Sequence, residues 1–190
     1  MASLQALFFT ATTLLLFVPH ACTASASTTL LEDECESYAG GDQGSYGYCV
    51  WKLGRDKASA TAADALGLAA IAARMARATA KATAARIAAL QAEETVPARR
   101  DCLAACAAEY AAAVRRLGRA ARDASAARGG GGRSLQRAET LLAVVAGAPA
   151  RCDGAFAAAG EHSPLDGADR GLDDEVELAI ALLPSPPVAG

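Results

Sequence analysis

Alanine content is the feature that most constrains how this chain can fold. Alanine occupies 51 of the 190 positions, and 31 of the 70 positions between Ala58 and Ala127. It has the highest helix propensity of all residues and a low strand propensity. Aromatic residues make up only 5% of the chain, so most of its apolar surface comes from methyl groups. The composition therefore predicts an all-α fold and argues against a β-sandwich or barrel.

The first 26 residues carry no charged side chain, and we interpret them as a secretory signal peptide. An apolar run from Leu4 to Val18 is followed by Pro19 and by Ala24-Ser25-Ala26, which fits a cleavage site. A membrane anchor is the alternative, but the run is about 15 residues long and a bilayer span needs ~20. We find no second apolar stretch of that length, so we expect a soluble, secreted mature protein without membrane attachment.

Charge divides the remaining chain into three segments. Residues 27–50 carry five acidic and no basic side chains, residues 51–152 carry eight acidic and 17 basic ones, and residues 153–190 carry eight acidic and one basic. A basic middle segment can indicate nucleic-acid binding. Here the arginines lie among alanines, with almost no aromatic residues for base stacking, so solvated helix faces explain them better.

Hydrophobic periodicity predicts four amphipathic helices. Their approximate limits are 58–90, Pro97 to the glycine run at 129–132, Ser134 as N-cap to Pro149, and Gly171 to Leu183. Such helices favour an up-down-up-down four-helix bundle over residues 57–184. A short segment at residues 27–56 precedes this bundle, and the proline-rich residues 185–190 are expected to form a disordered tail.

Residue spacing predicts which side of each helix is buried. The second helix has a heptad seam in which small residues alternate with large ones: Leu103, Cys106, Tyr110, Ala113, Leu117 and Ala120. The first helix separates an apolar side from a basic side, with Leu68, Ile71 and Met75 opposite Arg74, Arg77 and Lys81. The fourth has an apolar stripe of Leu172, Val176, Ile180 and Leu183, with Asp173, Asp174 and Glu175 in its first turn.

Cysteines of a secreted chain are expected to form disulfides. Cys22 lies in the predicted signal peptide, so an odd number remains: Cys35, Cys49, Cys102, Cys106 and Cys152. Cys35 and Cys49 lie 14 residues apart in a glycine- and tyrosine-rich stretch, which suggests a locally stapled hairpin. Cys152 then pairs with Cys102 or Cys106, and spacing alone does not choose between them.

No catalytic motif is recognisable in the sequence. His162 is the one histidine left after signal cleavage, and no neighbouring pattern pairs it with a nucleophile. The run Gly129–Gly132 lacks the Lys-Ser/Thr of a phosphate-binding loop and is interpreted as a connection between helices. We therefore predict no enzyme activity, catalytic residue, metal site or cofactor. A thiol enzyme acting through Cys102 is the weakest alternative.

Several short motifs occur in an order that resembles a known family. They are Cys35; Tyr48-Cys49-Val50 with Leu53; the run from Ala63 to Ala72; Cys106 with Tyr110; Cys152 with Phe156; Ser163-Pro164-Leu165; and the run from Leu178 to Leu183. Over about residues 35–183 this set resembles the plant invertase/pectin methylesterase inhibitor family. Within it, the pattern looks most like the invertase-inhibitor branch, which includes pollen allergens.

The resemblance implies a fold, a disulfide pairing and an activity. The fold would be a four-helix bundle preceded by an N-terminal helical hairpin, with bridges Cys35–Cys49 and Cys106–Cys152 and a free thiol at Cys102. The activity would be one-to-one binding to a pectin methylesterase or acid invertase of the cell wall or apoplast, which blocks its substrate cleft. The family implies no cofactor. A non-inhibitory structural or signalling protein of the cell wall or pollen is the alternative.

Two further expectations concern the target and the docking surface. Invertase-directed members often carry Pro-Lys-Phe before the third bundle helix, and residues 131–137 of this chain lack it. The resemblance thus does not choose between pectin methylesterase and invertase. The candidate contact residues are the basic side chains of the first two bundle helices: Arg74, Arg77, Lys81, Arg115, Arg116, Arg119 and Arg122. They could attract an acidic target surface.

Overall fold

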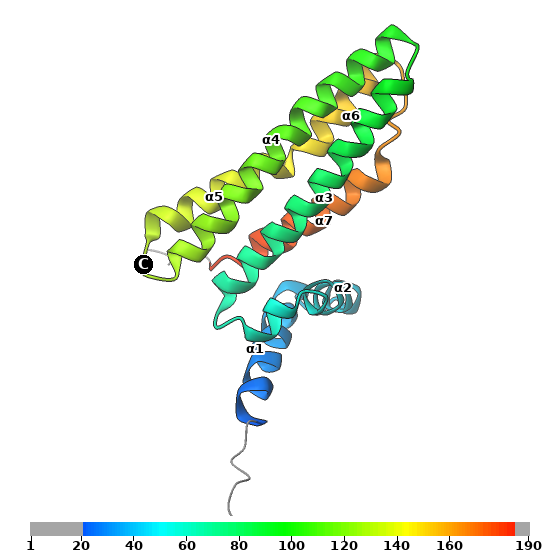
Figure 1. Cartoon of the computed structure of the whole chain (residues 1–190). Coiled ribbons are helices and arrows are strands. Elements are labelled where there is room, and N and C mark those ends of the chain that lie inside the picture. Colours follow the sequence, from blue (N-terminus) through cyan, green and yellow to red (C-terminus); the bar gives the residue numbers. More distant parts are fainter. Residues whose placement is uncertain (1–20, 185–190) are drawn as a thin grey trace, which may run out of the picture.

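A computed structural model describes residues 21–184, and this range contains helices and no strand (Figure 1). The elements are α1 (Ala21–Ala39), α2 (Gln43–Gly54), the short 3-10 helix η1 (Lys57–Thr61), α3 (Ala65–Glu93), α4 (Pro97–Ala127), α5 (Gly132–Ala146), α6 (Ala148–Ala158) and α7 (Asp166–Ala181). The predicted all-α class is confirmed. Most of the predicted signal peptide (residues 1–20) and the predicted tail (185–190) lie outside the described residues.

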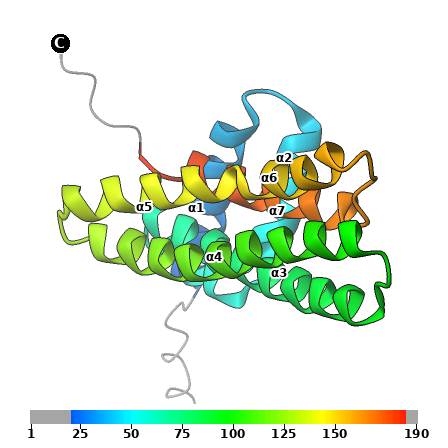
Figure 2. The same ribbon diagram turned by 90° about the horizontal axis from the view of Figure 1, so that it is seen from above.

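The bundle has four arms that run alternately up and down: α3, α4, α5 with α6, and α7 (Figures 1 and 2). The α1–α2 hairpin lies at the end of the bundle where α3 begins (Figure 1). Gly40 and Gly41 turn the chain between α1 and α2 with φ values of 54° and 94°, which residues with a side chain rarely adopt. The predicted hairpin and four-helix bundle are therefore both present.

The first bundle helix begins at Ala65, whereas the sequence predicts a start near Ala58. Asp64 is extended, with φ −162° and ψ 169°, and its carboxylate accepts a hydrogen bond from the backbone N–H of Gly67 at 2.8 Å. This N-cap satisfies a backbone donor that the first helical turn leaves free. The preceding residues form η1, which Asp56 caps in the same way.

The third arm is longer than predicted, because the chain passes Pro149 and continues as α6 to Ala158. Pro149 lies in the first turn of α6, where a helix needs no backbone N–H from it, so it begins a helix instead of ending one. Ser134 is also not the N-cap of α5, since Gly131 occupies that position and no side chain caps this helix.

The combined α5–α6 segment corrects another expectation. This segment, Gly132–Ala158, has 27 residues and is long and apolar enough to cross a membrane by length and composition alone, because it contains an 18-residue window with a mean hydropathy of 1.3. The expectation that no second such stretch exists was therefore wrong. In the structure this segment packs against α4 and α7, and a disulfide links it to α4. These contacts make it the third arm of the bundle.

The heptad seam predicted for α4 is confirmed. Every seam residue is buried, and the seam continues to the end of the helix through Ala124 and Ala127. Across from it, α3 buries mainly methyl groups: Ala69, Ala70, Ala72, Ala73, Ala76 and Ala80. Small side chains let two helix backbones approach closely, so the high alanine content is part of the packing of α3 against α4.

The apolar stripe predicted for the last helix is only partly correct. Leu172, Val176 and Leu183 are buried, but Ile180 is 36% exposed. The buried band of α7 is centred near Ala179, because α7 packs against α3 on one side and against α5 and α6 on the other. Ile180 lies about 100° around the helix from Ala179 and therefore falls at the edge of the band. The helix also begins at Asp166, five residues before Gly171.

Two disulfides staple the fold, and they are the pairs that the family resemblance implies. Cys35–Cys49 joins α1 to α2, with Cα atoms 5.5 Å apart, and Cys106–Cys152 joins α4 to α6, with Cα atoms 4.6 Å apart. Cys102 has a free thiol, which is buried and donates to the backbone oxygen of Ala155 at 3.3 Å.

Candidate protein-binding surface

The seven basic residues proposed as contacts lie on α3 and α4. These helices are antiparallel, and their register places the basic residues of one helix beside those of the other. Arg77 reaches across from α3 and donates from Nε to the backbone oxygen of Val114 at 3.2 Å. Its side chain lies over Gly118, where an added Cβ would be 3.0 Å from Nε. Arg128, directly after α4, pairs with Asp64, directly before α3, at 2.9 Å and marks the same register. Arg74 is therefore level with the turn of α4 that carries Arg119.

These basic residues divide between two sides of α4. Arg74, Lys81, Arg115 and Arg122 are exposed, and with Arg77 they form what we call the basic surface of α3 and α4. Arg119 instead lines a groove of about 420 Å³ between α4 and α5, formed with Asp123, Gln136, Arg137, Thr140 and Leu141. Arg116 is three residues before Arg119 and lies on this second side.

No residue of the basic surface forms an ion pair within the described part of the chain. The acidic residues of α4 that could neutralise it point elsewhere. Glu109 pairs with Arg151 at 2.9 Å, and Asp123 pairs with Arg137 at 3.0 Å. The basic surface thus keeps its positive charge and would attract an acidic partner.

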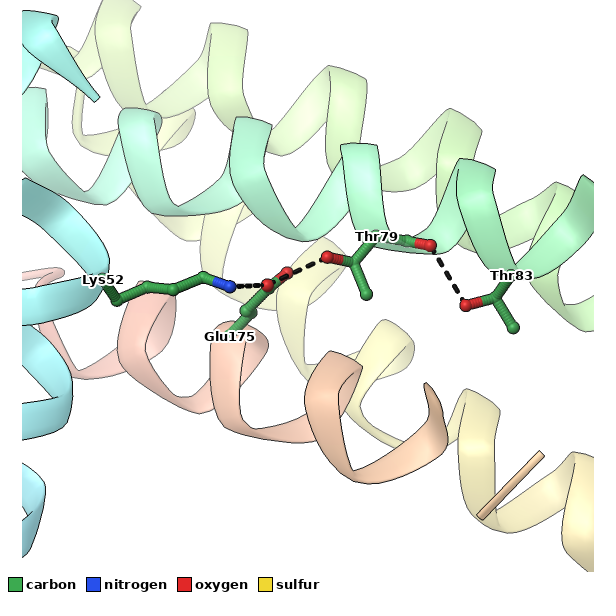
Figure 3. A network of polar contacts seen from close by, with 4 residues as sticks. All are labelled: Lys52, Thr79, Thr83 and Glu175. Atoms are coloured by element: carbon green, nitrogen blue, oxygen red, sulfur yellow. Dashed lines mark hydrogen bonds and ion pairs between the residues drawn. The ribbon is translucent and has the colours of Figure 1, made fainter. Parts of the chain in front are cut away.

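A polar network joins the hairpin to the bundle (Figure 3). The Glu175 carboxylate of α7 is buried and accepts from the Lys52 ammonium of α2 and from the Thr79 hydroxyl of α3, the latter at 2.9 Å. Thr83 continues the network by donating to the backbone oxygen of Thr79 at 3.1 Å. Glu175 thereby contacts side chains from two other helices and fixes the place of α2 against the bundle.

A second buried network lies among α4, α6 and α7. The Tyr110 hydroxyl donates to Asp169, which is 3% exposed. Burial raises the pKa of Asp169 to about 6, and the nearby charge of Asp153 also raises it. The hydrogen bond from Tyr110 acts in the opposite direction and lowers this pKa. Burial and the hydrogen bond with Asp169 raise the pKa of Tyr110. One oxygen of Asp153 and one of Asp169 are buried without a hydrogen-bond partner.

This second network could be mistaken for a metal site, because Cys152 lies close to Asp153 and Asp169. The Cys152 sulfur is bonded to Cys106, however, and a cysteine binds a metal ion as a free thiolate. This leaves two carboxylates as possible ligands, those of Asp153 on α6 and Asp169 on α7. The chemistry of this cluster is therefore that of a buried acidic pair with a tyrosine donor.

Comparison with known proteins identifies the family. The family model described as plant invertase/pectin methylesterase inhibitor matches residues 20–182. The chain belongs to this family. The match covers the hairpin and all four arms of the bundle, and it does not distinguish the branches of the family. Comparison with curated proteins gives no match.

Proteins of the invertase/pectin methylesterase inhibitor family are inhibitors and not enzymes, and they bind pectin methylesterase or invertase as protein targets. The sequence offers two residues that could be considered for catalysis, His162 and Cys102. The side chain of His162 is exposed in the loop between α6 and α7, and the Cys102 thiol is 5% exposed inside the bundle. A solvent-borne substrate would not reach that thiol, so the structure gives the thiol-enzyme alternative no support.

Among the residues of the two networks, the sequence pattern predicts burial for Tyr110 but not for Glu175 or Asp169. The pattern places Glu175 in the first turn of the last helix, and it assigns no role to Asp169. With α7 starting at Asp166, Asp169 and Glu175 lie three residues on either side of the buried Leu172. Helical spacing would have placed both acids on the buried side if the start of the helix had been recognised.

Proposed function

We propose that this protein is a secreted inhibitor that binds a pectin methylesterase or an acid invertase of the plant cell wall and blocks its substrate cleft. The observation that carries the proposal is the family match over residues 20–182. A bundle stapled by Cys106–Cys152 is a stiff body, and a binding surface that is already ordered loses little conformational freedom on association. Inhibition by such a body would need no cofactor and no turnover.

The basic surface of α3 and α4 is the docking surface we favour. Its cations are not neutralised within the described chain, and Arg77 is already held by Val114, so binding would not need to order it. Surface cations of this kind act chiefly on association rate and on orientation. An acidic rim around the target's cleft would be complementary to them.

The test is a pair of inhibition assays. The oxidised mature protein is titrated into pectin methylesterase and, separately, into acid invertase, and we expect loss of one activity at stoichiometric to micromolar inhibitor. If neither enzyme loses activity, the inhibitor proposal fails and a structural or signalling role in the cell wall or pollen takes its place.

Charge-reversal variants test the docking surface. Arg74→Glu with Lys81→Glu should weaken inhibition roughly tenfold or more and make association less dependent on salt. The matched control is Arg133→Glu with Arg170→Glu, which changes the net charge equally at exposed positions of α5 and α7. Equal effects of the two pairs, or an association rate that salt leaves unchanged in the parent protein, would rule out this surface.

A further inference from the structure

Trp51 is an exposed aromatic side chain outside every site described above. It is the sole tryptophan of the chain and is 55% exposed, more than any other large apolar side chain in the described range. It lies on α2 directly opposite Cys49 and Leu53, which are fully buried. The helix thus holds the indole away from the core, on a backbone that the Cys35–Cys49 disulfide anchors.

One flank of the indole is cationic and the other is bare. The guanidinium of Arg55 lies 4.9 Å from the ring centroid, and the ring of Tyr48 lies 6.4 Å away at a tilt of 39°. Helical spacing puts Gly47 and Gly54 on the other flank. A Cβ added at either glycine would meet nothing within 4 Å. A flat ligand could therefore approach the indole from that flank.

The positive charge of Arg55, beside the indole, is not neutralised by an acidic side chain of the described residues. Lys52 is occupied by Glu175, but Arg55 forms no ion pair within the described residues. The other exposed large apolar side chains, Val96, Val144 and Ile180, lie on the α3–α4 connection, on α5 and on α7. Within the described range, Trp51 therefore has no second exposed large apolar side chain beside it on α2.

We propose that Trp51 and Arg55 form a binding site for a uronic-acid oligosaccharide or polymer. The C–H face of a pyranose ring would stack on the electron-rich indole face, and its carboxylate would pair with the Arg55 guanidinium. Guanidinium binds carboxylates in a fork that suits a planar anion. This choice of ligand rests on the proposed function with a pectin methylesterase as target: that enzyme produces uronates from pectin, so its inhibitor would be retained on the polymer that the enzyme modifies.

The test uses the emission of Trp51, which reports on this site alone because no other tryptophan is present. Titration of the oxidised protein with an oligogalacturonate should quench or shift this emission with saturation. A neutral oligosaccharide of the same length should not, and full methyl esterification of the oligogalacturonate should weaken the effect about tenfold. No saturable change with oligogalacturonate would overturn the proposal.

Variants separate this site from general attraction of anions. Arg55→Gln keeps the fluorophore and should weaken binding about tenfold, whereas the matched control Arg170→Gln on α7 should not. Gly47→Gln fills the bare flank and should weaken binding while improving helix propensity. Equal binding of polyglutamate would indicate an acidic protein segment instead, and emission that varies with protein concentration would indicate a second copy. No enzyme is present in this experiment, so its failure would leave the inhibitor proposal untouched.

Discussion

Lys52 of α2 and Glu175 of α7 form the ion pair that joins the hairpin to the bundle (Figure 3). The two partners are not equivalent, because the side chain of Lys52 is 19% exposed and that of Glu175 only 4%. Lys52 can reach water if it loses its partner. Glu175 cannot, and one of its oxygens already has no hydrogen-bond partner. Removing Lys52 and removing Glu175 should therefore change the stability of the protein by different amounts.

We predict that Lys52→Met destabilises the protein more than Glu175→Gln does. The first variant leaves a buried carboxylate without a cation, at a cost of about 3 kcal/mol. The second keeps an acceptor for Thr79 and lets Lys52 turn to solvent, so we expect about 1 kcal/mol. Urea denaturation with the disulfides intact measures both. The double variant should lose less than the sum, and additive losses would mean that the pair is not coupled.

Asp169 should make stability depend on pH. Burial raises its pKa to about 6, above the value near 4 expected in the unfolded chain. A group with a raised pKa contributes fully below the unfolded pKa, and its contribution is lost as pH rises through the folded pKa. The native protein should therefore lose roughly 2–3 kcal/mol from this group between about pH 4 and pH 7.

The variant Asp169→Asn checks the assignment of this pH dependence. The amide oxygen can still accept from Tyr110, but the side chain no longer titrates. Denaturation midpoints at several pH values should show a smaller decrease for the variant than for the parent protein between pH 4 and pH 7. An unchanged decrease would assign the effect to other groups, such as Asp173, whose pKa burial also raises.

The buried side of α4 could be predicted because its large residues recur every seven positions and small ones fill the layers between them. The burial of Asp169 and Glu175 could not, because a charged side chain normally indicates solvent exposure. Their partners, Tyr110 and Lys52, are separated from them in sequence by 59 and 123 residues. Contacts of this range depend on how the helices pack, and the sequence pattern of one helix does not contain that information.

Prediction from local sequence failed where the same residue type occurs in two different structural positions. Pro149 is compatible with the end of one helix or the first turn of the next, and only packing of α6 against α4 decides between them. The relative positions of the basic residues depend on the register that Arg77 and Val114 fix between α3 and α4. Sequence analysis could group these residues by charge but could not separate Arg119, which lines the groove on the other side of α4.

Cys102 should be protected from alkylation in the native protein. Its thiol is 5% exposed and hydrogen-bonded to Ala155, so a mild alkylating reagent should not label it. In protein produced without the predicted signal peptide, unfolding in urea without reductant should expose one thiol per molecule, since Cys35, Cys49, Cys106 and Cys152 are paired. Mass spectrometry after a short labelling pulse counts the modified residues. Stoichiometric labelling of the folded protein would contradict the prediction and revive a reactive role for Cys102.

The two disulfides should contribute unequally to stability. Cys106–Cys152 closes 46 residues of chain and Cys35–Cys49 closes 14, so the chain-entropy argument assigns about 4 and about 3 kcal/mol to them. Loss of the longer bridge should also free α6 from α4, whereas loss of the shorter one should affect mainly α1 and α2. Paired Cys→Ala variants compared by urea denaturation give the two free-energy losses, and hydrogen exchange shows where protection decreases. Two outcomes would contradict this prediction: a larger free-energy loss for the Cys35–Cys49 variant, or decreased protection in α6 when only that bridge is removed. Either would show that the hairpin stabilises the bundle more than the covalent link between α4 and α6 does.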